Sequence, residues 1–482
     1  MALVFVLWIM AILCAVALEL KFSSHLRMQV TASTSGAAKA LFLARAGVER
    51  TIAELVEGRN KVQAQADLRE SQTRVYQNVE LGDGSYTLYV GMDTAGEPVY
   101  GIGDEAAKIN VNTAEESILD VVPRMDADLV AGILALRKQE ELHDLNDLLL
   151  LENVDFLVLY GEDQNSNGLL DPNENDGDQS WPPDDADGVL DEGLTAYLTT
   201  WSAARNVTAD GNKRVDLNSA GAEDIAKSVT GISSQEAESI VAHREKNKFA
   251  AIVDLLDVEL VEKKPEEQPD RPDGRERREG GPEREGPRGG PPQAGGEEEK
   301  PEGNGDEEEE TEGEPESRSE PGRPRPEQPD ESERAGRGEQ RQQQTATQGT
   351  GQKAFDMGKF RQIADLVTTA EGEVRKGVVN INTAPREVLA CLPGLDDALA
   401  RQIVQSRQGR KTGFQTEAEL LDVDGITLEV FKEVWPHISA RSDVFNVRSF
   451  GVVGTGNTYC CVSAVIDRTE NQVKIGYWRE LE

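Results

Sequence analysis

The chain opens with an apolar stretch, MALVFVLWIMAILCAVALEL, whose first charged side chain is Glu19. A helix of about 20 such residues crosses the ~30 Å hydrocarbon core of a membrane. Apolar residues then recur at helical spacing from Leu43 to Val56, and Gly58 can end the helix. The pattern predicts one long helix from about residue 1 to Val56, of which residues 1–20 form the transmembrane part.

Alternating patterns typical of β-strands lie near both ends of the chain. RVYQNVEL and SYTLYVGM, joined by a Gly-Asp-Gly turn, occupy residues 74–92. DVFNVRSFGVVG, TYCCVSAVID and QVKIGYWRE follow residue 442 and are separated by turn-forming sequences. We expect these pieces to form one antiparallel sheet. Residues 1–107 and 440–482 would then make a single α+β body, with the rest of the chain inserted between its halves.

A helical pattern occurs three times within that insertion. It begins as KINVNTAEESILDVV at Lys108, RVDLNSAGAEDIAKSV at Arg214 and VVNINTAPREVLACL at Val378. Each copy has a strand-like entry, an Asn-Ser/Thr-Ala triplet and two apolar helical patterns. We therefore predict three all-α modules of the helix-hairpin-helix or SAM-like type. Their predicted ranges are residues 108–160, 212–261 and 378–438.

The polar side chains of each triplet are predicted to cap the N-terminus of the helix that follows. The capping candidates are Asn112, Thr113, Asn218, Ser219, Asn382 and Thr383. The second helix of each module ends near an arginine. These arginines are Arg137, Arg244 and Arg407.

Some modules of this type bind DNA through a Gly–apolar–Gly hairpin, whose glycines let backbone N–H groups approach a phosphate. The corresponding triplets here are Arg124-Met125-Asp126, Gly231-Ile232-Ser233 and Gly394-Leu395-Asp396. None has the second glycine, and two place a carboxylate where the phosphate would lie. We therefore predict that the modules serve as packing or protein-contact surfaces, with no nucleic-acid partner.

Residues 262–352 are of low complexity, rich in Glu, Pro, Gly, Arg and Gln, with almost no apolar side chain to bury. We predict a disordered acidic insertion here, between the second and third modules. The whole chain of 482 residues has a formal net charge of −38, and the acidity extends beyond this insertion. Such a charge disfavours non-specific nucleic-acid binding and is compatible with calcium or with basic partners.

The segment DQNSNGLLDPNE, residues 163–174, matches the loop pattern of an EF-hand, with Gly168 at the sharp turn. Calcium takes about six to eight hard oxygen ligands in a flexible shell, and this pattern supplies them. The predicted ligands are Asp163, Asn165, Asn167, Leu169 through its backbone carbonyl, Asp171 and Glu174. An acidic turn without a metal is the alternative, because Asp, Asn and Gly dominate turns.

A second acidic stretch, DDADGVLDEG, repeats the internal spacing of this loop but has Pro183 at the first ligand position and Leu194 at the last. It is interpreted as a partial second calcium site. Its candidate ligands are Asp184, Asp185, Asp187, Val189, Asp191 and Glu192. Both stretches lie in residues 161–195, where the flanking helices of an EF-hand are not evident. A bound ion is therefore predicted to stiffen this region rather than to act as a sensor.

No catalytic motif of the GxSxG, Walker A, HExxH or Rossmann type is present, and the four histidines are scattered. We predict that the protein is not an enzyme and takes no small-molecule substrate. The four cysteines form no disulfide framework and no zinc motif. The adjacent Cys460 and Cys461 either form a strained bond or place one side chain in the core from a strand.

Several segments together resemble one family. These are LARAGVER in the N-terminal helix, the module VNINTAPREVLACLPGLDDALARQIVQSRQ, the acidic loop and the terminal YWRE strand. The chain is similar to the minor pseudopilin K of type II secretion, also called general secretion pathway protein K. The resemblance covers both ends of the chain and the third module. The insertion at 262–352 lies outside it, and the family typically carries fewer helical modules.

This resemblance implies a pilin-like α+β fold with a helical insertion, bound calcium, and a single pass through the inner membrane with the bulk of the chain in the periplasm. It also implies a pseudopilus tip complex with the minor pseudopilins I and J, which promotes filament initiation for protein export. Most pilin-like subunits carry Glu at the fifth position, where this sequence has Phe5. A carboxylate in hydrocarbon is costly unless it is paired, so Phe5 suits a subunit with no neighbour above it.

The basic leader that a prepilin peptidase removes from such subunits does not precede Met1 in this sequence. Either the sequence is that of the mature chain, or the leader lies upstream. Two other functions remain open at this point. One is a type IV pilus minor pilin, and the other is a membrane-anchored extracytoplasmic DNA receptor of the helix-hairpin-helix type.

Overall fold

The computed structural model describes residues 2–58, 75–92, 97–181, 183–261, 349–454 and 458–481. All of them belong to one compact unit, which comprises residues 1–263 and 347–482. The predicted disordered insertion lies outside the described residues except at its end, where the chain enters a short strand, β10 (Gly349–Lys353).

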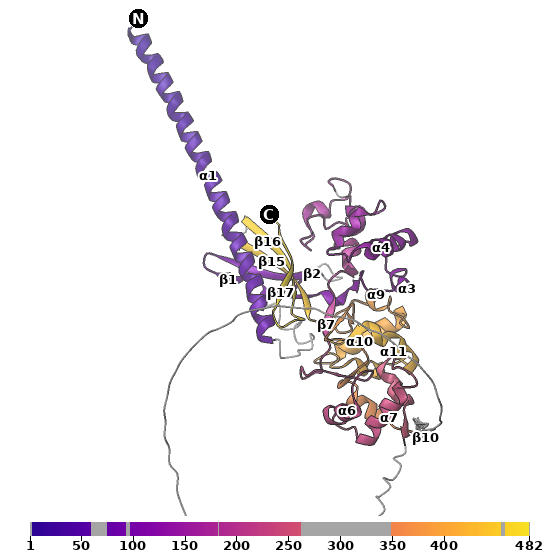
Figure 1. The fold of residues 1–482 in the computed structure, drawn as a ribbon. Coiled ribbons are helices and arrows are strands. Elements are labelled where there is room, and N and C mark those ends of the chain that lie inside the picture. Colours follow the sequence, from indigo (N-terminus) through magenta and orange to yellow (C-terminus); the bar gives the residue numbers. More distant parts are fainter. Residues whose placement is uncertain are drawn as a thin grey trace, which may run out of the picture. The chain divides into compact units, whose positions relative to one another are not determined.

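The long N-terminal helix predicted from the sequence is α1 (Ala2–Glu57), and its C-terminal half packs on an antiparallel sheet (Figure 1). The strands of this sheet are β1 (Val79–Leu81), β2 (Gly84–Met92), β3 (Pro98–Tyr100), β4 (Gly103–Asp104), β15 (Val444–Val453), β16 (Thr458–Asp467) and β17 (Lys474–Leu481). Their order is β1-β2-β15-β16-β17, with β3 beside β2 and β4 beside β15. Strands from both ends of the chain thus pair directly, with Tyr86 opposite Gly451. The predicted α+β fold with a helical insertion is confirmed.

Small residues let α1 lie directly on this sheet. Ala40, Ala44 and Val48 are fully buried, and the last two belong to an apolar cluster with side chains of β2, β15 and β16. A Cβ added at Gly451 of β15 would overlap the carbonyl oxygen of Ala40 and lie 2.5 Å from the amide nitrogen of Ala44. The glycine is therefore required for the close approach of helix and strand.

The inserted modules each contain the same four helical elements in the same order, and the third of them is a 3₁₀-helix. Module 1 contains α3 (Glu116–Leu119), α4 (Ala127–Gln139), η3 (Leu145–Leu150) and α5 (Phe156–Tyr160). Module 2 contains α6 (Ala222–Ser228), α7 (Ser234–Arg244), η6 (Ile252–Asp257) and α8 (Met357–Ile363). Module 3 contains α9 (Arg386–Leu389), α10 (Asp397–Gly409), η7 (Glu417–Asp422) and α11 (Leu428–Val434). One hydrophobic core runs through all three modules.

A two-residue parallel strand pair closes each module. The pairs are β5 (Ile109–Asn110) with β6 (Leu198–Thr199), β8 (Val215–Asp216) with β11 (Val367–Thr368), and β13 (Val379–Asn380) with β14 (Ile438–Ser439). Module 1 therefore extends past the acidic stretches to residue 199. Module 2 extends to residue 368, so the segment after Val261 leaves from within this module rather than from between modules 2 and 3.

Short elements connect these parts. Strand β9 (Glu259–Val261) pairs with β10, and β7 (Ala203–Arg205) pairs with β12 (Val374–Lys376), both antiparallel. Other 3₁₀-helices in the described ranges are η2 (Glu105–Ala107), η4 (Pro172–Glu174), η5 (Gly193–Ala196) and η8 (Trp435–His437).

The asparagines of the repeated triplets do not cap helices, and that prediction is wrong. Helices α3, α6 and α9 begin after Glu115, Gly221 and Pro385, none of which makes a side-chain capping bond. Each asparagine instead pairs with the backbone of one residue about 30 positions later. The pairs are Asn112 with Leu142 (2.9 and 2.9 Å), Asn218 with Phe249 (3.0 and 3.0 Å) and Asn382 with Phe414 (2.8 and 2.9 Å). An asparagine amide matches the donor and acceptor of a peptide group, so it closes each module across its hairpin.

The arginines noted in the sequence have an equally repeated role. Arg407 donates from Nη1 to the carbonyl oxygens of Ile381 (3.0 Å) and Ala384 (2.7 Å). Arg137 and Arg244 make the same two bonds in modules 1 and 2. Each arginine thus ties the second helix of its module to the entry segment, where these carbonyls would otherwise lack partners.

Buried ion pairs join modules 2 and 3. Arg214 lies 2.7 Å from Asp365 and 3.0 Å from Glu417, and Arg375 lies 3.4 Å from Glu417. Two further ion pairs link the same two modules. In each pair, the 3₁₀-helix of one module is joined to the last helix of the other. These pairs are Arg361 with Asp422, and Lys432 with Asp254 at 2.6 Å. Modules 2 and 3 therefore pack as a unit.

Candidate functional site

The first acidic loop follows α5 and ends with η4, inside module 1. Asp163 accepts hydrogen bonds from the backbone N–H groups of Asn167 and Gly168, both at 2.9 Å. The side-chain oxygen of Asn165 accepts from the N–H of Asn167 (2.8 Å), and that of Asn167 from the N–H of Leu169 (2.6 Å). These bonds wind the chain into a tight turn in which Gly168 has a φ of 70°, the left-handed conformation expected at this position.

Glu174 closes the loop from its other end. Its two carboxylate oxygens accept from the N–H groups of Gln164 (3.2 Å) and Asp171 (3.0 Å). The side-chain amides of Asn165 and Asn167 both donate to Asp171 Oδ2, at 2.7 and 2.9 Å. Five of the six predicted ligands therefore belong to one hydrogen-bonded loop through their side chains. The sixth, Leu169, packs its side chain on the cluster of Tyr89, Phe450 and Cys461 on the sheet.

Two of the three carboxylates of this loop are buried with little compensating charge. Asp163 is 3% and Glu174 is 1% exposed. Burial raises the pKa of Asp163 to about 6, although Arg448 opposes the shift, and it raises the pKa of Glu174 to about 7. Removing carboxylates from water disfavours their charged form unless a cation is near.

The donor set of the loop fits calcium by type, since it consists of carboxylate, amide and carbonyl oxygens. Within the described residues, however, no three Asp, Glu, His or Cys side chains lie close enough together to hold a metal ion. In this structure the amide nitrogens of Asn165 and Asn167, rather than their oxygens, face Asp171. A bound ion would require these two side chains to turn.

The second stretch divides into two parts. Asp184 accepts from Asp176 and Gly177, while Asp185 and Asp187 accept from N–H groups within the stretch. The predicted ligands Asp191 and Glu192 instead pair with arginines from outside it. Asp191 pairs with Arg124 of module 1, and Glu192 pairs with Arg448 of β15 at 3.2 Å. Val189 has its N–H bonded to Asp187 and its side chain exposed.

Two residues that the sequence analysis missed join the acidic stretches to each other and to the sheet. Glu162 accepts from the N–H groups of Asp191 (3.2 Å) and Asp185 (3.4 Å). Arg448 bonds Glu192 and the carbonyl oxygen of Val90 (3.3 Å). A Cβ at Gly168 would overlap the guanidinium of Arg448. No local pattern marks these roles, because both depend on residues distant in sequence.

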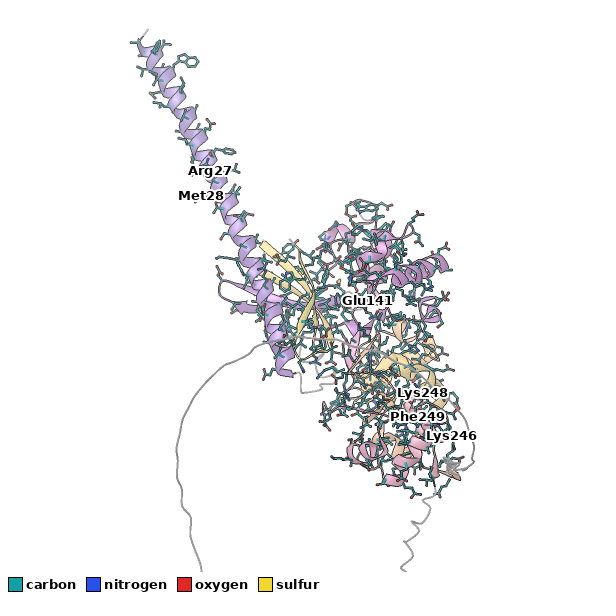
Figure 2. All side chains as sticks on the ribbon, viewed as in Figure 1. Arg27, Met28, Glu141, Lys246, Lys248 and Phe249 are labelled. Carbon is teal, nitrogen blue, oxygen red and sulfur yellow. The ribbon has the colours of Figure 1, made fainter. Side chains whose placement is uncertain are left out.

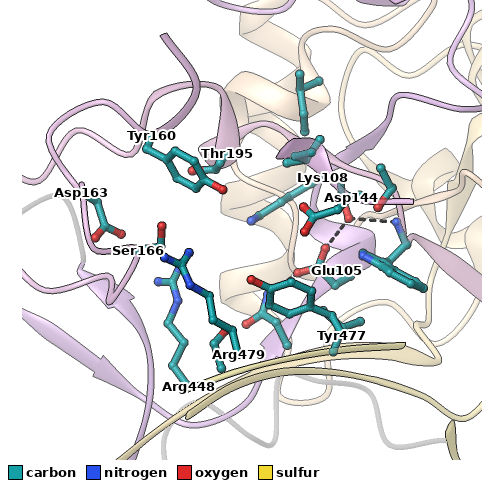
Figure 3. Close-up of a pocket in the computed structure, with 18 residues that line it drawn as sticks. Glu105, Lys108, Asp144, Tyr160, Asp163, Ser166, Thr195, Arg448, Tyr477 and Arg479 are labelled. Atoms are coloured by element: carbon teal, nitrogen blue, oxygen red, sulfur yellow. Dashed lines mark hydrogen bonds between the residues drawn. The ribbon is translucent and has the colours of Figure 1, made fainter. Parts of the chain in front are cut away.

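A cavity of about 120 Å³ lies beside this loop, between module 1 and strands β15, β16 and β17 (Figure 3). Asp163 and Ser166 of the loop form part of its wall, and Tyr160 of α5 and Tyr477 of β17 form other parts. The hydroxyl of Tyr160 donates to Asn146 at 2.6 Å. The cavity has both polar and apolar walls and adjoins the predicted metal loop.

The hairpins of the three modules end in side chains that cap the following helix. Asp126 accepts from the N–H of Leu129 (2.8 Å), and Asp396 accepts from the N–H of Leu399 (2.8 Å). Ser233 accepts from the N–H of Glu236. The helix N–H groups that would otherwise face a phosphate are thus occupied, two of them by carboxylates.

No other part of the chain that the structure describes buries the N-terminal part of α1. Large apolar side chains from Leu3 to Val30 are at least 46% exposed, and Phe5 is 74% exposed. Figure 2 shows these side chains projecting from the helix as far as Arg27 and Met28. Among the described residues, α1 alone is long and apolar enough to cross a membrane, a test that a signal sequence near the N-terminus also passes.

The adjacent cysteines are free and buried. Cys460 and Cys461 lie on β16, where successive side chains point to opposite faces of the sheet. The side chain of Cys461 packs on Tyr89 and Phe450. Of the two alternatives drawn from the sequence, the structure has buried thiols rather than a vicinal bond.

Comparisons with known proteins identify the repeated motif but no family for the whole chain. A helix-hairpin-helix motif model matches residues 210–268 and 374–439, which overlap modules 2 and 3, and this confirms that part of the prediction. No curated protein matches. Among solved structures, a chain of the GspK–GspI–GspJ complex from the type 2 secretion system of enterotoxigenic Escherichia coli is similar, with 20% identity and a TM-score of 0.18. The similarity covers 26% of this chain and 44% of that one.

Proposed function

We propose that this protein is a non-enzymatic minor pseudopilin of the type II secretion system. It is held in the inner membrane by α1 with its bulk in the periplasm, and it forms the pseudopilus tip with the minor pseudopilins I and J. The observation that carries the proposal is the division of α1 into two halves. The second half packs on the sheet, while the first half exposes almost every apolar side chain.

An apolar helix that the rest of the protein leaves uncovered needs another apolar environment. Full burial of one Leu, Ile or Phe side chain contributes about 1.5–3 kcal/mol, and the exposed half of α1 has many of them. A membrane and, later, the helical core of a filament both provide such an environment. A pilin-like subunit uses both in turn. A simple membrane anchor does not require its helix to continue beyond the membrane and pack on a sheet.

The tip position is supported by the lack of a carboxylate in α1 before Glu19. A carboxylate within hydrocarbon requires a partner, and the uppermost subunit has no neighbour to provide one. Phe5 meets this condition. Its replacement by Glu is expected to lower secretion, and Phe5→Leu serves as the matched control.

Calcium is proposed as the ligand of the first acidic loop. The loop has buried carboxylates with raised pKa values and an array of oxygen donors. Asp163, Asp171 and Glu174 would hold the ion, with Asn165, Asn167 and the Leu169 carbonyl. The ion would neutralise this cluster and stiffen the loop. The second stretch is a weaker candidate, because two of its acids pair with arginines.

The DNA-receptor alternative has less support, even though the motif model belongs to the helix-hairpin-helix type. The hairpin N–H groups are capped by Asp126, Ser233 and Asp396, and the net charge is −38. Binding to DNA depends on neutralising phosphates with Lys and Arg, and it weakens steeply with salt. A type IV pilus minor pilin differs from the proposed function mainly in its partner subunits.

The decisive experiment is co-purification of the full chain in detergent with the candidate I and J pseudopilins encoded by the same organism. We expect a stoichiometric complex that survives size-exclusion chromatography. If this complex does not form and the chain instead forms a complex with type IV minor pilins, the type IV pilus alternative is favoured. Salt-sensitive binding to duplex DNA in the absence of any pilin complex would favour the receptor.

A further inference from the structure

Three cationic side chains line the cavity beside the acidic loop (Figure 3). Within the described residues, only Arg448 of the three forms an ion pair with an acid. Lys108 reaches it from the segment before β5, Arg448 from β15 and Arg479 from β17. Three carboxylates line the same cavity, so the cations need a partner from outside only if these acids do not pair with them.

The three carboxylates that line the same cavity already have donors within the chain. Glu105 accepts from the side chains of Asn446 (2.7 Å) and Thr199. Asp144 accepts twice from the residue two positions later, at 3.2 and 3.0 Å. Asp163 accepts from two backbone N–H groups of its own loop. All three acids thus have hydrogen-bond donors from elsewhere in the chain, and among the three cations Arg448 also opposes the rise that burial causes in the pKa of Asp163.

Among the residues that the structure describes, two of the three cations form no ion pair with an acid. Arg448 pairs with Glu192 at 3.2 Å. Lys108 makes no side-chain hydrogen bond or ion pair in the described part of the chain, and the side-chain partner of Arg479 is the Tyr477 hydroxyl. Figure 3 shows the Lys108, Arg479 and Tyr477 side chains facing the same space.

A buried hydroxyl adds to this set of unsatisfied donors. Ser166 Oγ lines the cavity and, among the described residues, has no hydrogen-bond partner. The backbone φ of Ser166 is 58°, which is uncommon for a serine. Ser166 belongs to the same loop as Asp163. The cavity thus contains a lysine and a hydroxyl for which the described residues supply no acceptor.

We propose that this cavity binds a single carboxylate on a short aliphatic stem. Lysine and arginine bind carboxylates through charge-assisted hydrogen bonds, which are stronger than neutral ones. The carboxylates in the wall repel a doubly charged phosphate more than a singly charged group. Leu198, Trp201 and Val465 provide an apolar wall for methylene groups. The carboxylate belongs either to a free small acid or to an acidic side chain of a partner protein.

The test is isothermal titration calorimetry on the full chain in detergent micelles, with two probes of this chemistry. Butyrate represents a free acid, and an acetylated, amidated Ala-Glu-Ala tripeptide represents a protein side chain. The corresponding Ala-Gln-Ala tripeptide controls for charge. We expect saturable binding of at least one carboxylate probe and none of the glutamine peptide.

Lys108→Met and Arg479→Met are each expected to weaken that binding by about tenfold, because each removes a charge-assisted hydrogen bond. Lys213→Met is the matched control, since Lys213 is exposed and paired with Glu373. Circular dichroism checks that each variant is folded. Tyr477→Phe keeps the ring but removes the hydroxyl that positions Arg479, and it is expected to weaken binding less than Arg479→Met does.

Tighter binding of the tripeptide assigns the site to a protein side chain, and tighter binding of butyrate assigns it to a free acid. The proposal is overturned if neither probe binds saturably, if the glutamine peptide binds equally well, or if folded Lys108 and Arg479 variants bind like the unaltered chain.

Discussion

Glu417 is the residue whose removal is expected to destabilise the modules most. Its side chain is 4% exposed, and it lies between Arg214, 2% exposed, and Arg375, 6% exposed. Glu417→Ala would leave both arginines buried without this counter-charge. Breaking a buried ion pair by removing one partner costs about 3–5 kcal/mol. Because Asp365 still pairs with Arg214 at 2.7 Å, we place the expected loss near the lower end, at about 3 kcal/mol.

The pH dependence of stability is a second consequence of the same interaction. Burial alone would raise the pKa of Glu417, but Arg214 and Arg375 outweigh it and lower the pKa from 4.5 to about 2. Burial lowers the pKa of Arg375 to about 10, so this arginine stays charged at neutral pH. A shift of that size for Glu417 corresponds to about 3 kcal/mol. A lowered pKa stabilises the fold fully above about pH 4.5, and this contribution is lost as the pH falls towards 2.

The assay is urea unfolding of the full chain in detergent, followed by tryptophan fluorescence. Trp435 is a suitable reporter, because its carbonyl oxygen accepts from Arg375 at 3.2 Å and its ring lies under that guanidinium. Glu373→Ala is the matched control, since Glu373 forms an exposed pair with Lys213 and such pairs contribute less than about 1 kcal/mol. The reasoning is refuted if the two variants unfold at the same urea concentration, or if Glu417→Ala retains the acid sensitivity of the unaltered chain between pH 4.5 and 2.

Three further predictions concern other parts of the structure. Gly451→Ala is expected to destabilise the sheet by about 1–3 kcal/mol in thermal unfolding, because its Cβ would meet α1; Gly91→Ala, where the added Cβ meets nothing within 4 Å, should have a much smaller effect. Asn382→Ala is expected to lower stability by about 2 kcal/mol, since it leaves buried backbone groups of Phe414 unpaired; an unchanged Tm would contradict the closing role of this asparagine. Calcium is expected to raise the Tm and slow proteolysis within residues 161–195, and Asp163→Ala should abolish both effects; no response to calcium in the unaltered chain would exclude the metal site.

The parts that could be predicted from sequence are those fixed by long periodic patterns. The apolar run to Leu18 and the helical spacing after Leu43 specify α1, and the alternation around Val447 and Val462 specifies the central strands. The helical modules were recognisable because their pattern occurs three times. In each case many residues agree on one periodicity, so a single exception does not alter the conclusion.

The parts that could not be predicted depend on single contacts between distant residues. Asn382 resembles a helix cap in sequence, but its partner Phe414 is identified only when the hairpin is folded. The closing strand of module 2 has two residues, Val367 and Thr368, and it follows the long insertion, so no pattern links it to β8. Glu417 and Arg214 look like surface charges in the sequence. Burial of such charges depends on the packing of modules 2 and 3, which no local window contains.

The β9–β10 pair has a practical consequence for work on this protein. Val261 and Gly349 lie opposite each other in that pair, so the chain leaves and re-enters module 2 at one place. Joining two neighbouring points by a longer connection costs little, about 0.6 kcal/mol for each doubling of length. A reporter domain whose own ends are close together can therefore replace residues 262–348 without stretching the module. Such a graft would allow the protein to be followed in living cells while α1 and the sheet remain untouched.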